Sequence, residues 1–540
     1  MLQMFHDTKT EITNNISKFA QVSYDSSYVQ DDQYEINVTH YLIKIDLNTE
    51  DRKIKGDVTI TGKFLANNMK KIDLNFYNNM QIEQLTLNGN PSNYFFSSGT
   101  SLTIPLNKTV NDSFRIEIKY EGKPKHEGFG GLMFGEFNSK SVVYNLSEPN
   151  YASTWFPCND IPTDKALLDM EITNDTSDVS ISNGNLVDSS VSVSRKTYHW
   201  KTVYPISTYL VAVYSGDYKC FTENYVSQDK SDTMKIYYYA FPKDLKKAET
   251  DFIGHARMID FFAKTFGEYP FIKEKYGVAE FLWPMGAMEN QTITGIGANF
   301  VGGQNFFKDV YVHELAHHWF GDAVGLKTWK DIWLNEGFAS YCEALYFEHT
   351  SGEAALRSTM RSKFQTDFNG TVYNPSGGLF NSIVYDKGAW VLHMLRWEVG
   401  DSTFFKILKT YFDTYKYKNA STKGFENICE QVSKKHLSKF FDEWIFKGTG
   451  DLDIQYNWNA HAVADSFRIK INVNQTQKQY NTYFFPLEIQ FQDKNDSSIY
   501  SQKFYISSRD TTLLISTKSK PDGVLLDPDS WLLANIQEKK

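Results

Sequence analysis

Residues 313–317 read His-Glu-Leu-Ala-His, so His313 and His317 are four positions apart and Glu314 follows the first. The surrounding residues 310–320 are mostly apolar and include neither glycine nor proline, which favours a helix. On a helix, side chains four positions apart lie on one face, so both imidazoles could bind one Zn²⁺ ion at about 2.0–2.1 Å. Glu314 would then lie near the metal without binding it, where a general base for hydrolysis is needed.

A third ligand is predicted nineteen positions after His317. There, Glu336 lies within residues 333–339, which also favour a helix. Two histidines and one carboxylate are the ligands of a catalytic zinc site, in which a fourth position stays open for water or substrate. A metzincin would need a further histidine at position 323, which is alanine. The alternative interpretation is that these residues are ordinary helix charges and core histidines, and it must also explain a second motif.

That second motif precedes the predicted metal site, where residues 286–290 read Gly-Ala-Met-Glu-Asn. Together, Gly-x-Met-Glu-Asn, His-Glu-x-x-His and the Glu336 segment resemble peptidase family M1. This family comprises the zinc aminopeptidases that include aminopeptidase N and the leukotriene-forming epoxide hydrolase. The resemblance covers most of the chain, because it extends to residues 156–160, to residues 385–388 and to a β-rich tail.

The resemblance implies that residues 286–290 bind substrate, with Glu289 facing its free α-ammonium group. The physical reason is independent of the family. A carboxylate facing an ammonium gains a charge-assisted hydrogen bond, worth roughly 1.5–3 kcal/mol, that an internal peptide nitrogen cannot supply. The extended backbone of the segment would pair with the substrate as an added strand, and Met288 would floor the first side-chain pocket. The implied substrate-binding residues are Glu148, Gly286, Ala287, Met288, Glu289 and Asn290.

Two of the implied site residues lie outside that motif. Glu148 stands ten residues before Cys158, the spacing at which the family places a second amine-binding residue; the alternative is a solvated loop charge. Nearby, Asn159 and Ile161 occupy positions where the family more often has acidic or aromatic residues. Tyr385 resembles the catalytic tyrosine of the family, which would donate a hydrogen bond to the negative oxygen of the tetrahedral intermediate.

These residues predict a zinc aminopeptidase with one Zn²⁺ per chain, which cuts the N-terminal peptide bond with zinc-activated water and Glu314 as general base. A thermolysin-like endopeptidase shares the metal ligands, but the carboxylates of Glu289 and Glu148 would lie where an endopeptidase must accommodate more chain. An inactive homologue acting as a binding module is a further alternative. Such proteins commonly lose a metal ligand or the general base. Here all four residues are present: His313, Glu314, His317 and Glu336.

The elements that must position this site form a multidomain α+β fold. Alternation such as that at residues 41–47 predicts strands up to about residue 235, including one at residues 206–214. Helical spacing through residues 252–266 opens a mostly helical region, and alternation returns at residues 467–473 and 487–491. By resemblance, the domains are a flexible extension (1–30), a saddle-like N-terminal β domain (31–235), a thermolysin-like zinc catalytic domain (236–450) and an immunoglobulin-like β-sandwich (451–540). The helical C-terminal domain of the family is expected to be absent.

Composition limits the partners. The net charge is −9 and no block of five or six Lys or Arg residues occurs, so nucleic acid is not an expected partner. Peptides with a free N-terminus are the expected partners. Neither a signal-peptide pattern nor an apolar stretch of 18 residues is present, which predicts a soluble chain without a transmembrane segment. The compartment, cytoplasmic or secreted with the signal removed, and the oligomeric state stay open. The four widely spaced cysteines predict buried thiols, with one disulfide as the alternative.

Overall fold

The computed structural model describes residues 28–106, 112–366, 368–493 and 498–539. The predicted extension of residues 1–30 therefore lies almost wholly outside the described residues. The chain divides into two compact units, Met1–Trp329 with Tyr415–Ala420, and Lys330–Thr414 with Ser421–Lys540. This division falls inside the predicted catalytic domain, and the predicted domain boundaries remain predictions.

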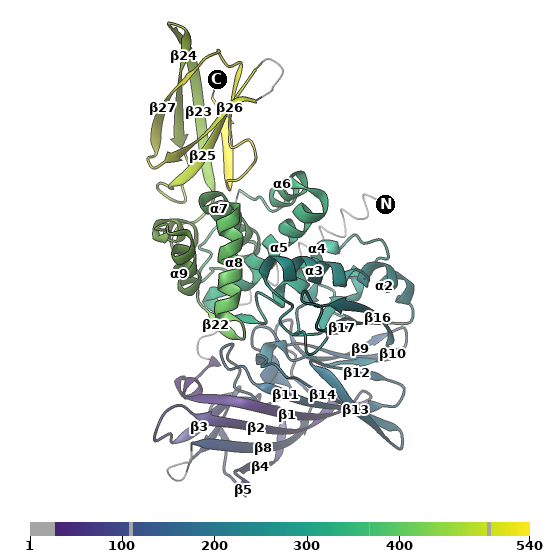
Figure 1. Ribbon diagram of the computed structural model, residues 1–540. Helices are drawn as coiled ribbons and strands as arrows, with labels where there is room; N and C mark the ends of the chain where they lie inside the picture. Colours follow the sequence, from purple (N-terminus) through teal and green to yellow (C-terminus); the bar gives the residue numbers. More distant parts are fainter. Residues whose placement is uncertain (1–27, 107–111, 367, 494–497, 540) are drawn as a thin grey trace. The chain divides into compact units, whose positions relative to one another are not determined.

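In the first unit, an eight-stranded sheet has the order β13-β14-β11-β1-β2-β8-β4-β5 (Figure 1). Strand β1 pairs in parallel with β11 and antiparallel with β2. The strands span Ile36–Asn48 (β1), Lys53–Phe64 (β2), Gln81–Leu87 (β4), Asn90–Pro91 (β5), Ser113–Gly122 (β8), Leu167–Asp175 (β11), Asn185–Ser192 (β13) and Arg195–Lys201 (β14). Tyr41, Ile43, Ile45 and Leu47 are buried, which confirms the predicted alternation, because successive side chains of a strand point to opposite faces.

Two smaller sheets complete this β region, with the orders β12-β15-β10-β9 and β3-β7-β6. Their strands are Lys71–Asn75 (β3), Phe95–Phe96 (β6), Ser101–Pro105 (β7), Gly131–Phe137 (β9), Lys140–Leu146 (β10), Val179–Ile181 (β12) and Tyr214–Gly216 (β15). Short 3-10 helices occur at Asp31–Glu35 (η2), Ala152–Thr154 (η3) and Thr208–Leu210 (η4). These are the helices of the described residues before 236, as the sequence pattern predicted.

The predicted strand at residues 206–214 is wrong. The segment contains the 3-10 helix η4 and irregular chain, and Tyr214 alone belongs to a strand. The cause is competition from buried side chains. The amide N–H of Ala212 donates to Asn183 Oδ1 at 2.7 Å, and that of Val213 donates to Asn145 Oδ1 at 2.6 Å. Side-chain amides therefore take backbone donors that a neighbouring strand would otherwise bind.

The first unit also contains a five-stranded sheet of order β16-β17-β18-β20-β19. Its strands are Lys219–Val226 (β16), Thr233–Ala240 (β17), Tyr276–Phe281 (β18), Ala287–Met288 (β19) and Thr294–Gly297 (β20). The helices of this unit are Leu245–Phe252 (α2), His255–Phe266 (α3), Lys308–His317 (α4) and the 3-10 turns Ala298–Phe300 (η5) and Trp329–Asp331 (η6), whose last two residues belong to the second unit. The strands Val324–Leu326 (β21) and Lys418–Ala420 (β22) pair in parallel.

The helical spacing predicted through residues 252–266 is confirmed for His255–Phe266, which form α3, whereas Phe252 ends the separate helix α2. The break falls at Ile253 and Gly254, and Gly254 has φ +118°. A glycine adopts this conformation without the steric cost that a side chain would impose. Strands β18–β20 likewise interrupt a region in which helical spacing predominated.

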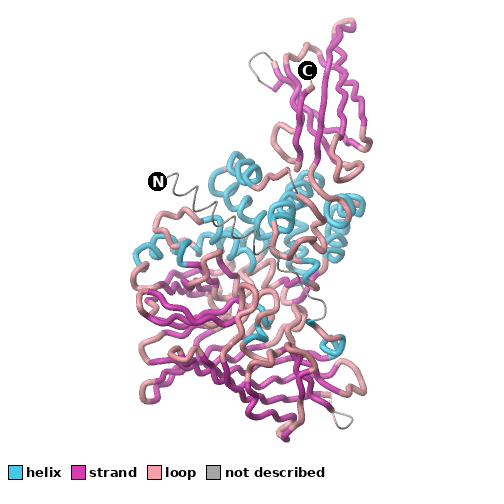
Figure 2. Tube along the Cα trace, turned by 180° about the vertical axis from the view of Figure 1, so that it is seen from behind, coloured by secondary structure: helices cyan, strands magenta, loops and turns pink. Residues whose placement is uncertain are grey.

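The second unit begins with helices. Figure 2 draws the described helices in cyan. Those of the second unit span Trp333–Ser351 (α5), Glu353–Ser362 (α6), Gly388–Val399 (α7), Asp401–Tyr415 (α8), Thr422–Ser433 (α9) and Ser438–Phe441 (α10), with π-helical turns at Ile383–Lys387 (η7) and Asp442–Phe446 (η8). Among the described residues, no helix is both long and apolar enough to cross a membrane.

Two sheets close the chain, of orders β27-β24-β23-β29 and β26-β25-β28. Their strands are Leu452–Val463 (β23), Ser466–Gln475 (β24), Phe485–Gln492 (β25), Ser498–Ile506 (β26), Asp510–Thr517 (β27), Gly523–Leu526 (β28) and Ala534–Glu538 (β29). Both sheets contribute buried alternating residues, such as Ile469 and Ile471 from β24 and Leu487 and Ile489 from β25. The predicted return of strands is confirmed.

All four cysteines are free thiols, so the disulfide alternative does not hold. Cys158, Cys342 and Cys429 are buried, as predicted. The prediction is wrong for Cys220, which is exposed because it lies on β16 at the edge of its sheet.

Candidate active site

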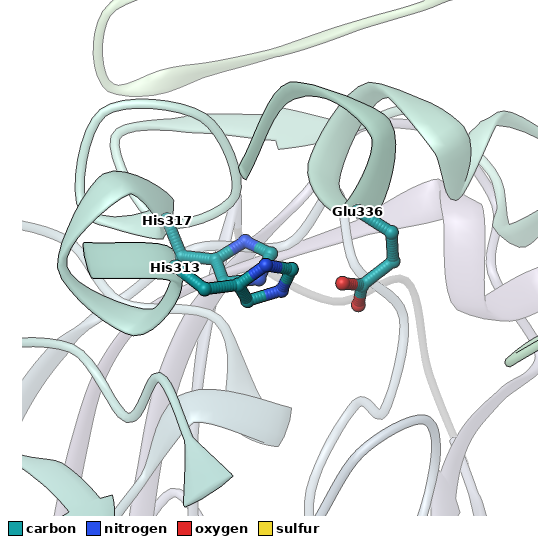
Figure 3. A group of neighbouring side chains, drawn as sticks. All are labelled: His313, His317 and Glu336. Carbon is teal, nitrogen blue, oxygen red and sulfur yellow. The ribbon is translucent and has the colours of Figure 1, made fainter. Parts of the chain in front are cut away.

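Helix α4 carries three of the predicted site residues. It confirms the predicted helix as far as His317, where it ends. The rings of His313 and His317 have centroids 4.8 Å apart and are inclined by 76°. In Figure 3 both imidazoles lie on the side of the helix that faces the carboxylate of Glu336. Glu314 follows His313 on the same helix and is buried.

A backbone hydrogen bond orients the ring of His317. Its Nδ1 donates a hydrogen bond to the carbonyl oxygen of Phe320 at 3.2 Å. This bond assigns the ring proton to Nδ1 and the lone pair to Nε2, the usual arrangement of a metal-binding histidine. A Cβ atom at Gly321 would lie 3.1 Å from His317 Nδ1, and Gly321 has φ +145°. Glycine is therefore required immediately behind the ring.

Glu336 lies in the first turn of α5, which confirms the predicted second helix. Ligand atoms of His313, His317 and Glu336 all lie within 4.8 Å of one another. Atoms bound to one tetrahedral Zn²⁺ ion at the usual bond lengths are roughly 3.4 Å apart. The three side chains therefore need only small adjustments to reach a common ion, and their donor set is that of a catalytic zinc site.

Glycine also sets the packing of the helix that carries Glu336. A Cβ atom at Gly337 would lie 3.0 Å from the backbone of Gly388 and 3.1 Å from the carbonyl oxygen of Val384. Helix α5 thus packs closely against the π-helical turn η7, which carries the half-buried Tyr385. Turns of this kind frequently occur at functional sites.

The Gly-Ala-Met-Glu-Asn motif lies at a sheet edge. Ala287 and Met288 form β19, the last strand of the five-stranded sheet, and the amide of Gly297 donates to the carbonyl oxygen of Gly286 at 3.0 Å. The predicted extended conformation is confirmed. Strand β19 also contacts helix α4. An edge strand can pair with a further extended chain, so this edge is suited to bind a peptide.

Acidic side chains gather beside this strand. Glu289 directly follows β19 and is 3% exposed, and Glu148 is 6% exposed and thus buried rather than solvated. Carboxylate oxygens of Glu148, Glu289 and Glu336 all lie within 4.8 Å of one another. Like charges this close disfavour each other, so a cation among them would be strongly favoured.

The chain that follows Glu289 is anchored by residues that sequence reasoning missed. The side-chain amide of the fully buried Asn290 donates to the hydroxyl of Tyr214 at 2.7 Å.

The amide N–H of Thr292 donates to Nε2 of His318 at 3.1 Å. Burial lowers the pKa of His318 to about 3, so this imidazole is neutral. Asp322 is also buried, and burial together with the nearby charge of Glu289 raises its pKa well above the ordinary value. The only sequence feature that could have pointed to His318 was its position directly after His317.

Comparison with known proteins gives two family matches. The model of the peptidase family M1 domain matches residues 252–444, and that of the peptidase M1 N-terminal domain matches residues 37–210. Similar curated proteins include "Probable aminopeptidase 2" of Sulfurisphaera tokodaii, 29% identical over 62% of this chain and 45% of the relative. "Leucine aminopeptidase 2" of Yarrowia lipolytica is 28% identical over 93% of this chain and 83% of the relative. The chain spans 45% and 60% of the lengths of the two Sulfurisphaera tokodaii aminopeptidases that it matches.

Solved structures show the same likeness. An M1 zinc metallopeptidase from Deinococcus radiodurans matches with a TM-score of 0.67 at 25% identity, covering 76% of this chain and 93% of that chain. Aminopeptidase A of Legionella pneumophila, in complex with aspartic acid, matches with a TM-score of 0.81 at 18% identity, covering 94% of this chain and 60% of that chain. The second likeness is one of fold.

Proposed function

The chain belongs to peptidase family M1, and on this premise we propose that it is a zinc-dependent aminopeptidase that removes the first residue of peptides. The observation that carries the proposal is the proximity of two carboxylate groups to a metal-ligand set. Glu148 and Glu289 approach Glu336 within 4.8 Å, and Glu336 approaches His313 and His317 within the same distance.

His313, His317 and Glu336 would hold one Zn²⁺ ion. The hydrogen bond from His317 Nδ1 to Phe320 supports this assignment, because it orients the ring and leaves Nε2 as the ligand atom. When bound in such a site, zinc lowers the pKa of water and polarises a carbonyl group.

Glu314 would act as the general base and acid. It would accept a proton from the attacking water and deliver that proton to the departing amine. Its position on α4, one residue from His313 and buried, supports this role, since a base must lie within hydrogen-bond reach of the water that it activates.

Recognition of the chain end would rest on Glu289 and Glu148. Both carboxylates would bind the substrate ammonium, and a peptide blocked at its amino end would leave them without a cationic partner. The backbone of Gly286 and Ala287 would pair with the extended substrate, while Met288 would floor the first side-chain pocket. Asn290, the last residue of the motif, would belong to the same substrate-binding segment.

Tyr385 would donate a hydrogen bond to the oxygen that becomes negative in the tetrahedral intermediate. The close packing of Gly337 against Val384 supports this role, because it brings the neighbours of Glu336 and Tyr385 together within the second unit. We also propose the domain boundaries near residues 235 and 450 and an immunoglobulin-like arrangement of the two C-terminal sheets.

The test combines zinc analysis with two matched substrates, an amino-acid anilide and its N-acetyl derivative. We expect one zinc per chain and hydrolysis of the unblocked substrate alone. Equal hydrolysis of the N-acetylated substrate would favour an endopeptidase, and absence of both zinc and hydrolysis would favour a binding module.

A further inference from the structure

The loop between β19 and β20 carries Glu289 and is held on two sides within the first unit. On one side, Asn183 Nδ2 donates to the carbonyl oxygen of Gln291 at 2.6 Å, and the amide of Gly184 donates to Oγ1 of Thr292 at 2.9 Å. On the other side, the amide of Thr292 donates to His318, which directly follows helix α4. The loop is thus fixed both to the N-terminal β region and to the helix of the metal ligands.

His318 links two segments of the first unit through hydrogen bonds of its ring. It is fully buried, and its ring stacks on Tyr269 with centroids 5.8 Å apart and an angle of 28°. Nε2 accepts the N–H of Thr292, while Nδ1 donates to the carbonyl oxygen of Glu314 at 3.3 Å. One neutral ring therefore joins the loop of Glu289 to the turn of α4 that carries Glu314.

Thr292 provides an independent observation, because its backbone has φ +66°. A β-branched residue in this left-handed region is strained, and such strain persists only where the surroundings enforce it. Here the enforcing contacts are the bonds to His318 and Gly184. A strained residue three positions after Glu289 indicates that the loop is held for a functional reason.

Asp322 faces the donor side of the same ring. One of its carboxyl oxygens lies 3.7 Å from His318 Nδ1, and within the described residues neither oxygen has a hydrogen-bond partner. The proton lies on Nδ1 because that nitrogen bonds the carbonyl oxygen of Glu314, which can only accept. That tautomer is the one in which Nε2 can accept the N–H of Thr292.

We propose that His318 is a positioning residue, which sets the amine-binding carboxylate of Glu289 at the correct distance from the metal ligands through its hydrogen bond with Thr292. The inference rests on the proposed aminopeptidase function. It concerns binding of the substrate ammonium, so loss of His318 should raise KM for unblocked substrates more than it lowers kcat.

The experiment compares three replacements of His318. The side chain of glutamine reaches the position of Nε2 and can accept from Thr292, whereas that of asparagine reaches only the position of Nδ1, and leucine offers no acceptor. We expect KM to rise about tenfold or more in His318→Asn and His318→Leu, with zinc content retained and a smaller loss of kcat, and to stay within about threefold of the native value in His318→Gln.

The matched control is His255→Leu. His255 is another buried histidine of the first unit, and burial lowers its pKa to about 4. Its Nδ1 donates to the local carbonyl oxygen of Phe252. It should lower stability and leave KM unchanged. If His318→Leu does not fold, the comparison of Gln with Asn decides, and equal KM values in those two variants would overturn the proposal. A native enzyme that fails to distinguish unblocked from N-acetylated substrate would instead refute the proposed function.

Discussion

Replacing Glu289 by glutamine should selectively weaken the processing of peptides with a free amino end. Glu289 is 3% exposed, so its bond with an ammonium group would be poorly screened by water. A charge-assisted hydrogen bond contributes about 1.5–3 kcal/mol, which corresponds to a loss of roughly 10- to 150-fold in kcat/KM. Glu148 keeps its carboxyl group within 4.8 Å of Glu289, so the lower half of that range is expected.

The assay measures kcat/KM of native enzyme and Glu289→Gln on an amino-acid anilide and on its N-acetyl derivative, with zinc content determined for both proteins. The variant should lose activity only on the unblocked substrate. Activity on the acetylated substrate should stay the same or rise, because glutamine no longer requires a cationic partner.

Glu280→Gln is the matched control. Glu280 is a fully buried glutamate of the same sheet, on β18, and its Oε2 accepts the amide N–H of Phe241 at 2.8 Å. Burial raises its pKa to about 8, so it is protonated at neutral pH and glutamine is a close mimic. The control should keep native selectivity. An unchanged preference for unblocked substrate in Glu289→Gln would refute the role of Glu289 as the ammonium sensor.

Four further outcomes test the chemistry. Tyr385→Phe should fold, bind zinc and lose about 10²–10³ in kcat, and near-native turnover would remove Tyr385 from the mechanism. Glu314→Ala should retain stoichiometric zinc with almost no hydrolysis, whereas a variant that still turns over would need another base. His313→Ala should lose both zinc and activity; retention of both would contradict its assignment as a ligand. Removal of zinc by a chelator should abolish hydrolysis and lower the Tm of the native chain, and added zinc should restore both.

Several features were predictable from local sequence because the physics that sets them is local. The four-residue spacing of His313 and His317 places two imidazoles on one face of any helix. Glu336 follows on a second segment with helical spacing, and the alternation in β1 and β24 marks strands that bury one face. These patterns act over a few residues, so the sequence alone determined the candidate ligands, the base and the order of strand-rich and helical regions.

Tertiary structure decided the features that depend on distant residues. Residues 206–214 alternate like a strand, yet the side chains of Asn145 and Asn183 take their backbone donors. The burial of Glu148 beside Glu289, and the connection of Thr292 to His318, join parts of the chain that are far apart in sequence. A hydrogen bond between remote groups leaves no periodic signature along the chain, which is why the sequence named the chemical groups and only the fold determined how they are held.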